Sequence, residues 1–274
     1  MRHFFRRFAR NKGAVVGLVI VGVVMLVALF AGLVFPVSPW NAVGDPLLDP
    51  LTDAAYPLGT DMLGRDIASG LAYGARVSLL VGLVSTAVAT FIGISIGAVA
   101  GYYGGRIDDV LMRLTEFFQT IPTLAMAVVL VAIFQPSLTS IITAIAVVSW
   151  PPVARLVRGE FMSLRSREFV QAAVVIGQSA PRIIFTQILP NTMSPIIVTA
   201  SLMIATAILT ESALSFLGLG DRNLMSWGFM IGAARTMIRE AWWMSFLPGL
   251  AILLTVLAVN LIGEGLNDAL RRPR

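Results

Sequence analysis

The stretch "GAVVGLVIVGVVMLVALFAGLVF", residues 13–35, carries no charged side chain. An α-helix rises about 1.5 Å per residue, so about 20 apolar residues cross the roughly 30 Å of a bilayer's hydrocarbon core. Backbone groups in lipid must be satisfied internally, which leaves helices and closed barrels as spanning structures. This stretch is too long for a barrel strand. It therefore predicts a transmembrane helix.

The rest of the chain repeats this pattern. Of the 274 residues, 57% are hydrophobic and 13% are charged, against about 25% charged in a soluble domain. We expect an all-α membrane protein with six transmembrane helices, the further five covering 77–100, 116–134, 138–157, 195–219 and 246–263. Pro122 falls inside the third of these, where neighbouring helices can accommodate a proline. Trp150-Pro151-Pro152 falls inside the fourth, where we expect a kink or break.

The polar segments between the spans divide the chain further. Their expected boundaries are a basic N-terminus at 1–12, an external turn-rich loop at 36–76, a cytoplasmic region at 158–194, a semi-polar segment at 221–243 and a tail at 264–274. With six spans, both termini lie on one side. Fifteen of the 20 Lys and Arg residues fall on that side and five on the other. The positive-inside rule makes the first side cytoplasmic. The net charge of +5 is thereby explained without a nucleic-acid partner.

Several kinds of chemistry are excluded by missing residue types. The chain has no cysteine, His3 is its only histidine and Lys12 is its only lysine. Thiol chemistry, Ser-His and Cys-His catalysis and His-rich zinc sites are therefore excluded. "ARNKGA" around Lys12 does not match the P-loop pattern for binding ATP. We predict no catalytic residue, metal or bound cofactor, and expect a non-enzymatic protein of the lipid bilayer.

The stretch "FVQAAVVIGQSAPRIIFTQILP", residues 169–190, separates the fourth and fifth spans. A first helix would place Phe169, Ala172, Ala173 and Ile176 on one face, because these positions follow i, i+3, i+4 and i+7. Gly177 would end that helix in the left-handed conformation. A second helix over about 181–189 would be closed by Pro190. The stretch could form a compact cytoplasmic knob that transmits a push, or an interfacial helix that covers the span ends.

Some polar residues have two readings each. Glu211 lies within the fifth span, and a carboxylate at that depth should face protein or water. It could line a solute path or gate, or brace neighbouring helices. Asp61, Arg65 and Asp66 in "PLGTDMLGRD" could contact a partner protein, or could cap turns and pair with one another. Asp108 and its neighbour Asp109 are expected to be a solvated or capping pair.

Residues 169–190 also resemble the cytoplasmic EAA signature of ABC-importer permeases. The matching positions are Gln171-Ala172-Ala173, Gly177 and Leu189-Pro190, with Gln171 in place of the usual glutamate. Further motifs resemble the C-type subunit of dipeptide, oligopeptide and nickel permeases, namely "PLGTDMLGRD", "YGARVSLLVGL", "GYYGGRIDDVLMR", "SFLGLG" and "SWGFMI". The resemblance covers nearly the whole chain.

This resemblance implies the type I ABC importer permease fold, with residues 77–263 as its core. It implies a bacterial inner-membrane protein that works with a homologous B-type permease, two ATP-hydrolysing subunits and an extracytoplasmic solute-binding protein. The residues that would couple to the ATPases are Phe169, Gln171, Ala172, Ala173, Gly177, Leu189 and Pro190. The partner of Asp61, Arg65 and Asp66 would be the binding protein or the B-type permease. Di- and oligopeptides are the expected solutes, with nickel chelates or other small solutes as alternatives. A secondary transporter that uses Glu211 as its ion-coupling site is the competing class.

Overall fold

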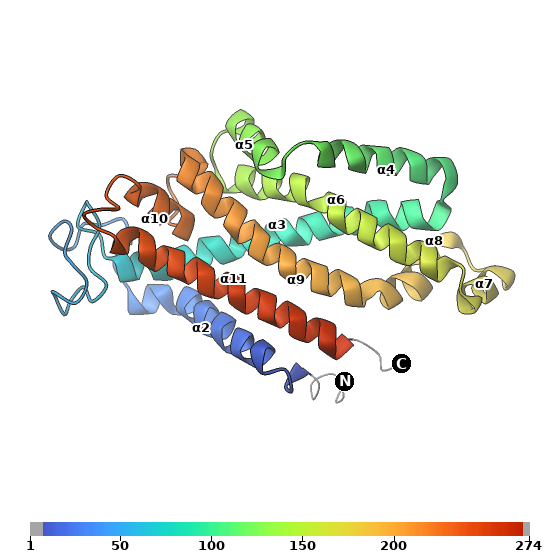
Figure 1. Cartoon of the computed structure of the whole chain (residues 1–274), viewed down its shortest axis with the longest axis horizontal. Helices are drawn as coiled ribbons and strands as arrows, with labels where there is room; N and C mark the ends of the chain where they lie inside the picture. The colour runs from blue at the N-terminus through green and yellow to red at the C-terminus, as the bar shows by residue number, and fades with distance from the viewer. Residues whose placement is uncertain (1–7, 271–274) are drawn as a thin grey trace.

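The computed structural model describes residues 8–270, all of whose regular elements are helical. The elements are α2 (Lys12–Val34), α3 (Ile67–Tyr103), α4 (Gly105–Thr120), α5 (Thr123–Phe134), α6 (Leu138–Arg165), α7 (Glu168–Val175), α8 (Ala180–Ile183), the π-helical turn η1 (Ile184–Ile188), α9 (Leu189–Leu214), the π-helical turn η2 (Ser215–Leu219), α10 (Trp227–Ala234) and α11 (Trp243–Leu270). The long helices form one elongated bundle (Figure 1). The predicted all-α membrane architecture is confirmed.

Within residues 8–270, five helical segments are long and apolar enough to cross a membrane, and α4 with α5 makes a sixth only if the bent pair counts as one span. The two helices of that pair meet at 87°. Ile121 is extended, with ψ 130°, because the ring of Pro122 disfavours the helical conformation in the residue before it. The expectation that Pro122 sits inside a continuous helix is therefore wrong. The third span is broken at this proline.

The fourth span shows the opposite outcome. Helix α6 runs without interruption from Leu138 to Arg165 and includes both Pro151 and Pro152. Of the expected kink or break at these prolines, the break is absent. The buried Pro151 and Trp150 are enclosed by neighbouring helices, which is the environment in which membrane helices tolerate proline.

Helix α3 forms the centre of the bundle and packs most extensively on α6. Gly93, Gly97 and Gly101 recur at intervals of four along its α6 side. A Cβ atom added to Gly97 would lie 2.8 Å from the Cβ of Val157, and the other two glycines meet α6 similarly. Small residues at this spacing let two membrane helices approach backbone to backbone. Helix α2 packs on α11, and α11 packs in turn on α9.

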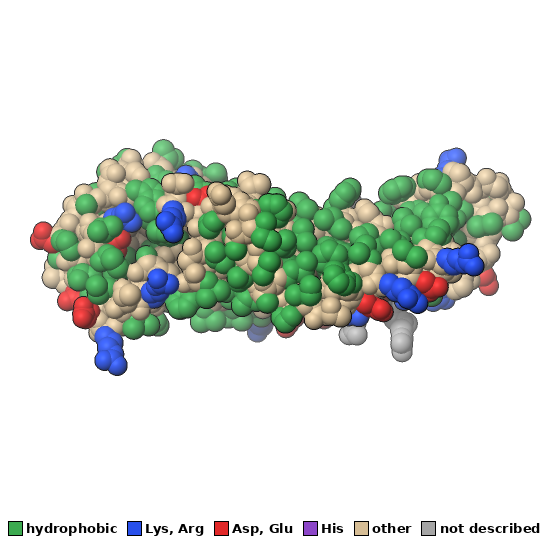
Figure 2. Space-filling model, turned by 90° about the horizontal axis from the view of Figure 1, so that it is seen from above, with side chains coloured by type: hydrophobic (Ala, Val, Ile, Leu, Met, Phe, Trp, Pro, Cys, Tyr) green, Lys and Arg blue, Asp and Glu red, His purple; other side chains and the backbone are tan. Residues whose placement is uncertain are grey.

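The two ends of the bundle differ in structure (Figure 1). One end carries the loop between α2 and α3, together with α10. Helix α3 begins at Ile67, ten residues before the expected start of the second span, and Asp66 caps it. The other end carries α7 and α8. The start of α2 and the end of α11 lie together, because Asn11 Nδ2 donates to Asp268 Oδ2 at 2.9 Å. On the face in Figure 2, charged side chains gather toward both ends and hydrophobic ones cover the middle.

Candidate functional site

The turn predicted at Gly177 is present. Gly177 has φ +79°, its N–H donates to the Val174 carbonyl, and the Gln178 N–H donates to the Ala173 carbonyl, both at 3.0 Å. This is the Schellman-type closure of a helix end. A Cβ on Gly177 would meet no atom within 4 Å. Glycine is therefore required by the backbone conformation and not by space.

The face of α7 that packs on the protein is not the one predicted. Val170 is 1% exposed and Ala173 is 4% exposed, and both join a buried cluster with side chains of α6, α8 and η1. Phe169, Ala172 and Ile176 are exposed. Apolar residues occur on both sides of this eight-residue helix, so periodicity alone selects no face. Of the two alanines of the signature, Ala172 faces outward and Ala173 is part of the core.

Gln171 joins α7 to the end of α6. Its Nε2 donates to the Arg165 carbonyl at 2.9 Å. A glutamate carboxylate has no hydrogen to donate to a carbonyl. The amide therefore makes a connection that the usual family residue would have to replace.

The second helix of residues 169–190 differs from its prediction, because the helix does not end at Pro190. Helix α8, η1, α9 and η2 continue one another, so the helical segment runs over Ala180–Leu219. Pro190 is the second residue of α9, and only Leu189 separates it from η1. A π-helical turn is wider than an α-helical one, and η1 lies just before Pro190, which has no N–H to donate. Leu189 and Pro190 thus connect α8 and η1 to the fifth span as one continuous helical rod.

Glu211 is enclosed near the far end of that rod. It is 2% exposed, and its Oε1 accepts from Ser215 Oγ at 2.8 Å and from Ser226 Oγ at 2.7 Å. Ser226 also caps α10, because its Oγ accepts from the Phe229 N–H at 3.0 Å. The other carboxylate oxygen, Oε2, has no hydrogen-bond partner among the described residues. This geometry favours the brace over the path-lining reading.

The brace extends to the central helix. The Trp227 N–H donates to Ser78 Oγ at 3.2 Å, and its Nε1 donates to the Leu71 carbonyl at 2.9 Å. A Cβ on Gly228 would lie 2.6 Å from the Ser212 Cα. Helix α10 is therefore held between α3 and the end of α9, and sequence reasoning did not identify these partners.

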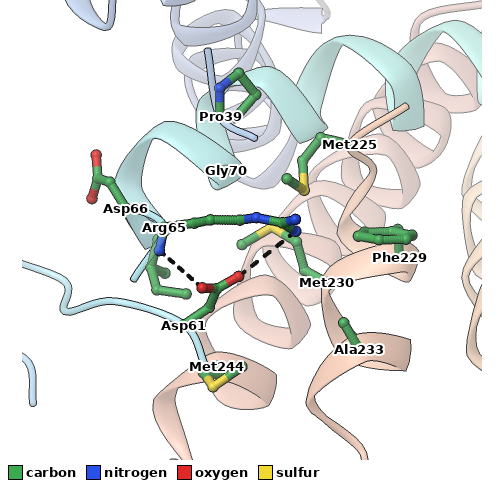
Figure 3. A pocket seen from close by; sticks show the side chains of 11 residues that line it. Pro39, Asp61, Arg65, Asp66, Gly70, Met225, Phe229, Met230, Ala233 and Met244 are labelled. Carbon is green, nitrogen blue, oxygen red and sulfur yellow. Dashed lines mark hydrogen bonds and ion pairs between the residues drawn. The ribbon is translucent and has the colours of Figure 1, made fainter. Parts of the chain in front are cut away.

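The loop residues of "PLGTDMLGRD" act on their own loop (Figure 3). Asp61 Oδ1 accepts from the N–H groups of Leu63 and Arg65, at 2.8 and 2.9 Å, and its Oδ2 lies 4.0 Å from Arg65 Nη1. The Arg65 guanidinium lies over the Trp40 ring, 4.9 Å from its centroid. Asp66 Oδ1 and Oδ2 accept from the N–H groups of Ala68 and Ser69, in the first turn of α3. The pocket in Figure 3 encloses about 30 Å³, which is room for a water molecule and not for a solute.

Asp108 was expected to form a solvated or capping pair with Asp109, and the structure gives it a different role. Asp108 is 7% exposed, and its two carboxylate oxygens accept from Arg158 Nε at 2.5 Å and Nη2 at 2.6 Å. Asp108 is therefore not solvated. It forms a two-point bond between α4 and α6, whereas Asp109 is exposed. The two aspartates are adjacent, so only the packing of α4 on α6 separates their roles.

Sequence families match two parts of this chain. The family "Binding-protein-dependent transport system inner membrane component" matches residues 93–273, and "N-terminal TM domain of oligopeptide transport permease C" matches residues 1–50. The chain is 44% identical to the di/tripeptide transport system permease protein DppC of Pseudomonas aeruginosa, over 98% of this chain and 91% of the relative. It is 44% identical to the dipeptide transport system permease protein DppC of Escherichia coli K12, over 98% and 92%. It is 37% identical to the oligopeptide transport system permease protein OppC of Haemophilus influenzae, over 97% and 86%.

The fold has a counterpart among solved structures. A chain of the MetNI methionine ABC transporter, in an inward-facing conformation, superposes with a TM-score of 0.62 at 16% identity. The match covers 74% of this chain and 97% of that one. At this identity the likeness concerns the fold, which is that of an importer permease.

Proposed function

The chain belongs to the family of binding-protein-dependent transport system inner membrane components, and we propose that it is the permease subunit of an ATP-driven importer of di- and oligopeptides. The similarity to dipeptide and oligopeptide permeases extends over nearly the full length of this chain and over 86–92% of each relative. The membrane path would form between this chain and a homologous B-type permease. An extracytoplasmic binding protein would deliver the peptide.

The observation that carries the proposal is an apolar surface at the α7 end of the bundle. We define the coupling surface as Phe169, Val174, Val175, Ile176 and Phe185. All five side chains are exposed, Val175 by 85% and Ile176 by 73%. The surface lies at the end of the molecule, on α7, the turn and η1 (Figure 1). A cluster of this kind outside the lipid region marks a protein contact.

The continuous rod provides a route for the work done by two ATPase subunits. A displacement of η1 reaches the Glu211 brace through α9, because the helix is continuous from Ile184 to Leu214. The brace joins this rod to α10 and α3 at the opposite end of the bundle. Closure of the ATPases would therefore move the outer end of the path together with the inner end. The chain has no P-loop of its own, so its partners would bind and hydrolyse ATP.

We place both chain ends and the coupling surface on the cytoplasmic side and the α2–α3 loop outside. The unequal distribution of Lys and Arg supports this orientation. Because the chain has no cysteine, Leu51→Cys and Val175→Cys each introduce a unique thiol at a side chain exposed by 87% and 85%, respectively. A membrane-impermeant maleimide should label Leu51→Cys in spheroplasts and Val175→Cys only in inverted vesicles. The reverse pattern would overturn the orientation.

The transport function is tested in proteoliposomes that contain the complete importer with its binding protein. We expect ATP-dependent uptake of labelled dialanine, and loss of ATPase association in Val175→Asp with the permease pair intact. Leu51→Asp is the matched control, since it places the same charge on an equally exposed apolar residue at the opposite end of the bundle. Uptake of a nickel chelate without peptide uptake would refute the proposed solute. Normal coupled uptake in Val175→Asp would refute the coupling surface.

A further inference from the structure

A stripe of polar side chains runs along α4. Asp109, Arg113, Glu116 and Thr120 follow at i, i+4, i+7 and i+11, so they share one face, and all four are exposed. Glu116 is eleven residues into α4, about 16 Å from its start at 1.5 Å per residue. On the face in Figure 2, which is the α4 side of the molecule, acidic and basic side chains lie along one edge toward the right-hand end. The stripe therefore continues from the end of the bundle well into the span.

The stripe borders a groove between α4 and α6. The groove consists of two hollows of about 450 Å³ each, and Arg155 of α6 borders both. The hollow nearer the α7 end is also lined by Arg113 and Glu116. The deeper hollow is lined by Gln119 and by Pro122, where the third span breaks. Volumes of this size are typical of sites for small molecules.

Arg155 points away from the helix on which α6 packs. Its neighbours Ala154 and Val157 are fully buried, and Val157 lies against Gly97 of α3. Arg155 itself is exposed and lies ten residues, about 15 Å, before the end of α6. Within residues 8–270, neither Arg155 nor Glu116 takes part in an ion pair, whereas Arg158, one turn further along, is bound by Asp108.

Charges and broken backbone at this depth require a polar environment. An unpaired charged side chain in hydrocarbon costs about 2.5–3.5 kcal/mol on insertion scales. Non-helical backbone is tolerated at membrane depth only against protein or a water-filled cavity. The break at Pro122 opens into the same groove, and no side chain caps the start of α5. The α4–α6 groove is therefore a wetted surface and not a lipid-facing one.

We propose that this groove is the wall that the chain contributes to the inner half of the peptide path, with Arg155 and Glu116 as a transient binding site for a zwitterion. The Arg155 guanidinium would receive the terminal carboxylate of the peptide, a planar match that lysine does not reproduce. The Glu116 carboxylate would receive its terminal ammonium group. This inference rests on the proposed function and specifies which surface of the chain contacts the solute.

The first test measures access to the groove. Gln119→Cys is a unique thiol in this chain, and inverted vesicles carrying the complete importer expose its inner side to a charged methanethiosulfonate reagent. We expect rapid modification of Gln119→Cys and slow modification of Phe117→Cys, an equally suitable exposed position on another face of α4. Millimolar dialanine should slow the first reaction at least threefold, and N-acetyl-dialanine amide should not. Equal reactivity of the two thiols, or a groove thiol that dialanine does not protect, would overturn the proposal.

The second test measures transport in the same preparations. Arg155→Gln should abolish the protection by dialanine and lower the maximal uptake rate about tenfold, the loss that one charge-assisted hydrogen bond predicts. Arg155→Lys should retain part of both effects. If Arg155→Gln transports normally, the binding site is refuted while the proposed function stands. If the wild-type importer fails to transport dialanine, the proposed function itself fails. Dissociation of the two permeases in Arg155→Gln would show instead that Arg155 pairs with the partner chain.

Discussion

The two alanines of the signature should respond to the same substitution in opposite ways. Ala173 is 4% exposed and belongs to a cluster with Val170, Ile183 and Ile188. An arginine there cannot remain in the core, because a buried unpaired charge is far more costly than exposing α7. Ala172 is exposed on the other side of α7, so the same arginine can extend away from the core without disturbing the fold.

The cost of Ala173→Arg can be worked from what α7 buries. This helix contacts the core through two buried side chains, Val170 and Ala173. Burial of a valine is worth about 1.5–3 kcal/mol, and a methyl group adds about 0.8 kcal/mol. Release of α7 therefore costs about 2–4 kcal/mol, so the open form of the wild type is disfavoured by roughly 30- to 700-fold at 1.4 kcal/mol per decade, and Ala173→Arg removes this bias.

The assay uses Val170→Cys as a buried reporter in the cysteine-free chain. We expect its thiol to react with maleimide at least about 30-fold faster when Ala173→Arg is added. With Ala172→Arg, the thiol should react at the unchanged rate, while the ATPases no longer co-purify. Equal reactivity in the Ala173→Arg background would refute the burial of this face. Retention of the ATPases by Ala172→Arg would refute its outward, partner-facing role.

Three further outcomes follow from single positions. Glu211→Gln should leave the complex assembled and change uptake less than about tenfold, because the amide oxygen still accepts from both serines. Glu211→Ala should lower the melting temperature of the solubilised complex. Abolished uptake in an intact Glu211→Gln complex would favour a charge-dependent role. Gly177→Val should lower the stability of the folded turn by about 1–2 kcal/mol, because φ is +79°, and should weaken ATPase co-purification. Gly177→Asn should be tolerated. Equal behaviour of the two variants would show that the turn tolerates any side chain. Gly97→Leu should destabilise the chain in a thermal melt, because a Cβ there already meets α6. Gly22→Leu should not, because a Cβ at Gly22 meets no atom of the described residues within 4 Å. Equal melting temperatures would contradict the close packing of α3 on α6.

Proline illustrates the limit of local inference. Pro122 breaks the third span at 87°, whereas Pro151 and Pro152 lie within an unbroken helix. Each proline removes one N–H and crowds the preceding turn, so the local cost is similar at all three. The surroundings differ, because Pro151 is buried against neighbouring helices whereas Pro122 is exposed. That information is distributed over α3 and α6 and is absent from the local sequence.

The polar residues show the same division between type and partner. A buried or paired role for Glu211 could be anticipated, because a carboxylate within an apolar span must avoid lipid. Its partner Ser226 is 15 positions away, beyond a turn, and no spacing rule joins them. The pairing of Asp108 with Arg158 spans 50 residues, and the α4–α6 groove was not predicted. The signal that could have indicated the groove was the i, i+4, i+7, i+11 stripe of polar residues on α4.

The sequence by itself determined the membrane class, the location of the apolar segments and the turn at Gly177. These properties follow from the length of apolar runs and from the conformational freedom of one residue, which are local quantities. Only the tertiary structure decided which face of α7 is buried, that α8, η1 and α9 form one rod, and which charges are paired. A helix with apolar residues on two sides, or a charge with several possible partners, has near-equal local alternatives. The packing of distant helices selects among them, because burial and hydrogen-bond satisfaction are summed over the whole bundle.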